Sequence, residues 1–124
     1  MYSRLSWFMA VCAVALLPIS GAAHHGWAGN GDEEFELSGT LASPVSLVGP
    51  HATMKIKASD GQVWDLTLAS VPQTKSAGLT EDAIPVGSPV TAHGHRNRDP
   101  KKFEMKTERV TFKGKTFNVY PNRS

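Results

Sequence analysis

The sequence predicts an all-β domain with one short helix, and three observations support this fold class. Several stretches alternate between apolar and polar side chains, which is typical of strands with one buried face. Asp60-Gly61 lies between two such stretches and is a strong hairpin signal. One segment, residues 72–79, interrupts the β pattern; its leading proline and late glycine are typical of the two ends of a short helix.

An apolar amino-terminal segment precedes this domain. It begins with the positive charge of Arg4, continues through the apolar residues 5–19, and has small residues three and one positions before a cut after Ala23. About 15 apolar residues are fewer than the roughly 20 that a membrane span needs. We therefore predict a cleaved signal peptide over residues 1–23, a periplasmic location and no membrane span in the mature protein. A retained anchor and a cut after Ala22 are the alternatives.

The mature chain then divides into three parts. Residues 24–33 contain three glycines without periodicity and form an irregular lead-in, and residues 121–124 form a tail. The domain between them covers residues 34–120. We expect its strands at residues 34–41, 51–58, 63–68, 90–95, 103–112 and 116–120, with a loop at residues 43–50.

The order of these elements predicts the topology. Three strands, a short helix and two further strands follow one another, which is the order of the OB-fold, a five-stranded Greek-key barrel. A six-stranded roll is the alternative. In the first three strands one face is clearly apolar, and Trp64 lies on such a face. The strand at residues 103–112 has no purely apolar face, so its register stays open.

Composition limits the kinds of metal ligand and of binding partner that the domain can have. The chain has one cysteine, Cys12, within the leader, so the mature domain has no thiol, and a metal site must use nitrogen and oxygen ligands. Charge is nearly balanced, with 13 basic and 11 acidic side chains. Balanced charge, export and few aromatic residues led us to expect no nucleic-acid partner. An acidic stretch at residues 32–36 and a basic loop at residues 96–102 are either solvated loops or a binding patch.

The mature amino terminus holds the strongest metal-binding signal. A cut after Ala23 would free the α-amine of His24, which forms a small chelate ring with the imidazole of the same residue, and His25 adds a second imidazole. Among divalent first-row metals, Cu(II) binds nitrogen sites most tightly. We therefore expect copper or another divalent metal here; an unstructured start of the chain is the alternative.

Three further histidines are weaker candidates for metal ligands, and one tryptophan is a weaker candidate for a ligand-site residue. His51 opens the second strand; it either caps the preceding loop or serves as a third ligand if the lead-in folds back over the barrel. His93 and His95 lie two apart in a strand and so point the same way, to share a metal or to line a polar face. Trp27 either covers a ligand site or anchors the lead-in to the core.

The chain resembles a family of small exported bacterial proteins whose function is not established. The resemblance rests on His-His-Gly-Trp at residues 24–27, Leu-Ser-Gly-Thr at 37–40, Gly-Pro-His at 49–51, Pro-Val-Gly-Ser-Pro-Val at 85–90 and Gly-Lys-Thr at 114–116. The family usually has asparagine at the first position of the third motif. The resemblance implies an exported β domain, and a mature amino-terminal histidine is also similar to that of copper-handling periplasmic proteins and copper oxygenases.

Two main functional hypotheses follow. The first is a non-enzymatic periplasmic module that holds Cu(II), or another divalent metal, through His24 and His51 with His25 third. The second is a metal-free OB-like module that binds a small ligand, a saccharide or a protein partner through its loop face. Its ligand-binding residues would be Trp27, Arg96, Arg98 and Lys102. A copper-dependent redox enzyme ranks last, because no nucleophile constellation or substrate pocket is recognisable.

Overall fold

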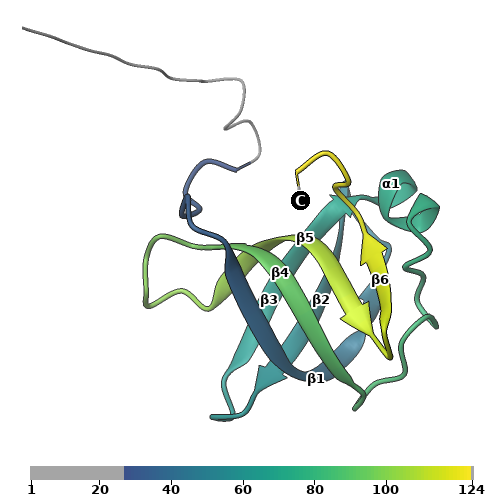
Figure 1. The fold of residues 1–124 in the computed structure, drawn as a ribbon, viewed down its shortest axis with the longest axis horizontal. Helices are drawn as coiled ribbons and strands as arrows, with labels where there is room; N and C mark the ends of the chain where they lie inside the picture. Colours follow the sequence, from purple (N-terminus) through teal and green to yellow (C-terminus); the bar gives the residue numbers. More distant parts are fainter. Residues whose placement is uncertain (1–26, 124) are drawn as a thin grey trace, which may run out of the picture.

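The computed structural model describes residues 27–123 and contains one six-stranded sheet that curls into a barrel (Figure 1). The signal peptide expected over residues 1–23 and the pair His24 and His25 lie outside the described residues. The elements are β1 (Phe35–Ser46), β2 (His51–Ala58), β3 (Val63–Ser70), α1 (Val71–Ser76), β4 (Pro89–Arg96), β5 (Glu104–Phe112) and β6 (Lys115–Asn118).

The strand pairing confirms the OB-like fold class. Neighbouring strands follow the order β3-β2-β1-β4-β5-β6, and a parallel pairing between β3 and β5 closes the barrel. Five strands form the closed barrel. The sixth, β6, pairs with the second half of β5, along the same edge whose first half meets β3. Among residues 27–123, no helix has the length and hydrophobicity needed to cross a membrane.

The first strand is longer than the sequence pattern predicted. We expected a loop from residue 43, but β1 continues to Ser46, and Val45 is buried in the core. Two register shifts occur along its pairing with β2, one on each side of Ser43. Such bulges let a strand keep its pairing through the proline at position 44, which cannot donate to the ladder. The expectation of a loop here was therefore wrong.

The helix matches its sequence signals. Ser70 accepts a hydrogen bond from the backbone N–H of Gln73 at 3.3 Å and so caps the first turn, in which Pro72 also lies. Gly78 follows the helix with φ of +90°, the left-handed conformation that commonly ends helices. The side chain of Gln73 donates to the carbonyl of Val119, which ties α1 to the end of the chain.

A bulge in β5 explains why neither of its faces looked apolar. Opposite β4, the register shifts between His93 and Gly94, whose partners are Arg109 and Thr107, so Glu108 is the extra residue. Met105 and Val110 both belong to the core, although strict alternation would place them on opposite faces of the strand. Glu108 lies two residues after Lys106, the register partner of His95, and its carboxylate lies next to that histidine.

Candidate functional site

The lead-in packs against the barrel rather than extending from it. Trp27 is buried, and its ring meets the ring of His95 edge-on at 5.7 Å and that of Tyr120 at 5.2 Å. The guanidinium of Arg123 lies 4.0 Å from the centre of the same indole. Asn30 donates to the backbone carbonyl of His95 at 2.8 Å. The lead-in, the tail and the barrel therefore meet at one place.

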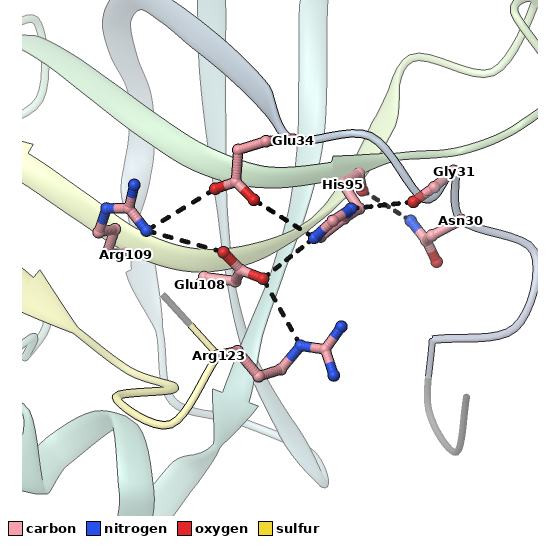
Figure 2. Close-up of polar contacts among 7 residues, drawn as sticks. All are labelled: Asn30, Gly31, Glu34, His95, Glu108, Arg109 and Arg123. Carbon is pink, nitrogen blue, oxygen red and sulfur yellow. Dashed lines mark hydrogen bonds and ion pairs between the residues drawn. The ribbon is translucent and has the colours of Figure 1, made fainter. Parts of the chain in front are cut away.

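Three ionisable side chains converge there, and we call them the Glu–His–Glu cluster: Glu34, His95 and Glu108 (Figure 2). His95 Nε2 lies 3.0 Å from Glu108 Oε2 and 3.5 Å from Glu34 Oε2. Glu34 directly precedes β1, His95 lies in β4, and Glu108 lies at the bulge of β5. The two carboxylates differ in exposure: the side chain of Glu108 is 1% exposed, and that of Glu34 is 49% exposed.

The hydrogen bonds of His95 define the state of its ring. Nδ1 lies 2.9 Å from the carbonyl oxygen of Gly31, which can only accept, so Nδ1 carries a hydrogen and donates it. The contact between Nε2 and Glu108 then also requires a proton, on the ring nitrogen or on the carboxyl group. The cluster therefore holds a proton between His95 and its carboxylates.

Two arginines surround the carboxylates. Arg109 Nη1 lies 3.7 Å from an oxygen of Glu34 and 3.7 Å from Glu108 Oε1, and Arg123 Nε lies 3.5 Å from Glu108 Oε2. Burial raises the pKa of Glu108, and the nearby Glu34 carboxyl group raises it further, while His95 opposes the shift. The buried carboxylate is thus only partly compensated by its cationic neighbours.

His51 lies apart from this cluster but is linked to it through one lysine. The pKa of His51 is lowered by partial burial and by the positive charge of Lys106. The ammonium of Lys106 lies 5.5 Å from the ring centre of Trp27 and 5.6 Å from that of Tyr120, and burial lowers its pKa. The lead-in therefore folds back to the side of the barrel that carries Lys106, whose charge reaches His51.

His93 and His95 project from the same strand but do not converge. His93 Nε2 contacts Glu36 at 3.1 Å, on the more exposed part of the sheet, whereas His95 is covered by the lead-in. The two imidazoles therefore have different carboxylate partners, and the expectation of a metal ion shared between them finds no support in this geometry.

The basic loop is largely occupied with contacts inside the molecule. The guanidinium of Arg96 lies 4.6 Å from the ring centre of Trp64 and donates to the carbonyls of Pro100 and Lys102. Arg98 donates to the carbonyl of Asn30 and contacts Asp32 at 3.5 Å. Lys102 is exposed. The acidic lead-in and the basic loop thus partly neutralise each other across an open groove of about 490 Å³.

Sequence reasoning missed most members of the cluster. Glu34 was assigned to a local negative stretch, Glu108 to a strand of open register, and Arg109 and Arg123 were given no role. The available signal was the run of charged residues within a strand, because a carboxylate in a buried strand needs partners. Which side chains become those partners depends on the strand pairing and on how the lead-in and the tail pack against the barrel.

Comparisons with known proteins support the fold alone. No family model matches the chain, and no curated protein does either. Among solved structures, the S. pombe Stn1–Ten1 complex matches with a TM-score of 0.51 and 13% identity over 64% of this chain. A ZRD-deleted mutant of TiaS in complex with agmatine matches with a TM-score of 0.51 and 14% identity over 70% of this chain. The chain spans 57% and 26% of the lengths of those two proteins.

These neighbours correct one expectation. We expected no nucleic-acid partner, and that exclusion was wrong, because two of the solved structures that share this barrel, the Stn1–Ten1 complex and TiaS, are OB-fold proteins that work with nucleic acids. Balanced charge and a small number of aromatic residues are insufficient grounds for excluding nucleic acid from an OB-like barrel.

Proposed function

We propose that this chain is an exported, periplasmic OB-like module that binds Cu(II), or another nitrogen-preferring divalent metal, at the amino terminus created by cleavage after Ala23. His24 would supply its α-amine and imidazole, with His25 and His51 as further ligands. The role is binding rather than catalysis. The resemblance to small exported proteins with a His-His-Gly-Trp mature start agrees with this proposal.

The docking of Trp27 is the observation that carries the proposal. Because consecutive residues span at most about 3.6 Å each, the Cα of His24 can lie no farther than roughly 11 Å from that of Trp27. The indole of Trp27 is held against His95 and beside Lys106, the residue whose charge reaches His51. A metal site that includes both His24 and a barrel residue is therefore within reach of the chain.

The chemistry of the available donors favours Cu(II). The mature domain has no thiol, so softer thiolate sites are excluded. Imidazole binds metals in its neutral form, and the lowered pKa of His51 keeps that ring neutral at neutral pH. An amine and imidazoles in the same coordination sphere form the nitrogen-rich set for which Cu(II) has the highest affinity among these metals.

The test compares three forms of the mature protein, whose start at His24 is first checked by amino-terminal sequencing of the exported chain. One form begins at His24, a matched control carries one added residue before it, and a third carries His51→Ala. Each is titrated with Cu(II) against a competing chelator, and its electron paramagnetic resonance spectrum is recorded. We expect tight one-to-one binding with nitrogen couplings, at least about tenfold weaker in the extended control because the chelate ring is lost.

Equal Cu(II) affinity in the first two forms would show that the α-amine of His24 is not a ligand. If the form with the added residue still binds Cu(II) tightly and His51→Ala does not, the metal is bound by the barrel and not by the terminal amine. The metal-free alternative, capture of an anionic saccharide or protein by the basic loop, is the weaker candidate, because Arg96 and Arg98 already have partners within the chain.

A further inference from the structure

We propose that the Glu–His–Glu cluster is a second divalent-cation site, independent of the amino terminus, in which Glu34, His95 and Glu108 each supply one ligand. The site would take a metal ion that accepts one imidazole and two carboxylates, such as Zn(II). It needs no residue outside the described part of the chain. It can therefore exist whether or not the terminal-histidine site does.

The spacing of the donor atoms suits a small divalent ion. The three ligand atoms lie within 4.8 Å of one another, and His95 Nε2 is 3.0 Å from Glu108 Oε2 and 3.5 Å from Glu34 Oε2. Zinc–ligand bonds of about 2.0–2.2 Å in a tetrahedron place neighbouring ligand atoms roughly 3.3–3.6 Å apart. Only small side-chain movements would be needed to receive the ion.

The hydrogen bond from Nδ1 prepares His95 for this role. Histidines that bind metals through one ring nitrogen almost always donate the other N–H to a carbonyl or carboxylate, which orients the ring and selects the tautomer. Here Nδ1 donates to the Gly31 carbonyl at 2.9 Å, so Nε2 faces the two carboxylates (Figure 2). The proton now shared between Nε2 and Glu108 occupies the position that the ion would take.

Glu108 provides a second, independent indication. Its side chain is 1% exposed, yet Oε1 accepts no hydrogen bond from any described residue. Arg109 Nη1 is 3.7 Å away, beyond hydrogen-bond distance, and also has no acceptor within the described part of the chain. Among the described residues, Glu108 Oε1 is therefore ion-paired with Arg109 but accepts no hydrogen bond, and a bound cation would supply the close contact that this buried carboxylate lacks.

Arg109 and Arg123 limit the affinity of the cluster for a metal ion. The two guanidinium groups already offset part of the negative charge of the carboxylates, so an incoming ion competes with them for it. Arg123 is the weaker competitor, because it comes from the chain end and its side chain is 34% exposed. Its removal should therefore increase metal affinity, whereas loss of a structural ion pair alone would leave metal affinity unchanged.

The experiment uses the mature chain with His24→Ala and His25→Ala, which silences the terminal site. Zn(II) binding is measured by calorimetry, and Co(II) absorption reports the ligand set directly. We expect one ion per chain, an affinity at least about tenfold lower in His95→Gln and in Glu108→Gln, and one at least about threefold higher in Arg123→Gln. The matched control is His93→Gln, on the same strand beside a single carboxylate, which should change affinity less than about twofold.

Circular dichroism confirms that each variant is folded before its affinity is compared. If a variant unfolds, the side-chain nitrogen resonances of His95 in the parent decide the question, because Zn(II) must shift Nε2 and leave Nδ1 protonated. The proposal is overturned if the folded parent binds no Zn(II), if His95→Gln binds as tightly as the parent, or if Arg123→Gln does not bind more tightly. None of these results depends on whether Cu(II) binds at His24.

Discussion

At the scale of single residues, His95 combines several distinct contacts. Its backbone carbonyl accepts from Asn30, its Nδ1 donates to Gly31, and its Nε2 meets Glu108. Its ring also packs against the edge of Trp27. One imidazole thus connects the lead-in to two barrel strands. A histidine suits this position because its two ring nitrogens can satisfy partners on opposite sides.

Tyr120 provides a test of how the chain ends pack. Its phenol packs against Trp27, and burial raises its pKa, although Arg123 opposes the shift. Above pH about 10 the unfolded chain releases this proton while the folded chain retains it, so stability falls as pH rises from about 10 to the folded pKa. We expect this alkaline loss of stability to be smaller in Tyr120→Phe.

The measurement is urea unfolding of both proteins between about pH 8 and about pH 11, a range that includes the ordinary tyrosine pKa of about 10. The difference in unfolding free energy between the wild type and Tyr120→Phe should be constant below pH about 10 and should then shift in favour of the variant. Parallel curves across the whole range would mean that Tyr120 is as solvated in the folded protein as in the unfolded one.

At the scale of elements, the close approach of β4 and β5 determines where the bulge can form. A Cβ built at Gly94 would lie 2.0 Å from the backbone oxygen of Lys106 and 2.9 Å from the Cα of Thr107. Both neighbours are backbone atoms and cannot move without separating the strands. Only glycine fits at this point, immediately after the register shift that introduces Glu108.

We therefore expect Gly94→Ala to lower the free energy of unfolding by roughly 2–3 kcal/mol through overpacking of the strand pair. The matched control is Gly31→Ala, where the nearest atom to a new Cβ is the Arg96 carbonyl oxygen at 3.7 Å, an ordinary contact. That substitution should change stability by less than about 0.5 kcal/mol. Equal urea midpoints for the two variants would show that β4 and β5 can separate without cost.

The predicted and observed ends of the strands and the helix show which boundaries depend on local sequence alone. The hairpin of β2 and β3 and the capped helix α1 depend on neighbours in sequence, and each was predicted within a few residues. The end of β1 was predicted wrongly because its pairing continues through two bulges. Whether a strand carries on past a proline depends on the partner strand, which local alternation does not describe.

At the scale of the whole molecule, the lead-in, the barrel and the tail are packed against one another. The part of the chain that the structure describes has two tryptophans, Trp27 in the lead-in and Trp64 in the barrel wall. The first is tied to Tyr120 and Arg123 near the end of the chain, so its environment depends on both termini. A small domain of this kind should unfold in a single transition.

In a form of the protein produced from His24 onward, Trp64→Phe leaves Trp27 as the one tryptophan, so fluorescence reports the lead-in while circular dichroism reports the barrel. We expect the two urea transitions of this variant to coincide. Because both signals come from one protein, any loss of stability caused by the substitution affects them equally. A fluorescence transition at lower urea than the circular dichroism transition would show that the lead-in detaches first.

Local order was determined by the sequence itself. Alternating side chains, the Asp60-Gly61 turn and the helix signals at Pro72 and Gly78 act between near neighbours, so they predict strands, a hairpin and a helix in the right order. That order, combined with the rules for short connections, was sufficient for the OB-like barrel. The candidate histidines could also be named from residue chemistry.

Only the tertiary structure decided which of those residues meet. Glu34 is far from His95 and Glu108 in the chain, and the three side chains converge because β1, which directly follows Glu34, is paired with β4, and β4 is paired with β5. The docking of Trp27 likewise depends on surfaces supplied by both ends of the domain. A periodic pattern describes the near neighbours of a residue, whereas a site depends on barrel closure and register, which are properties of the whole chain.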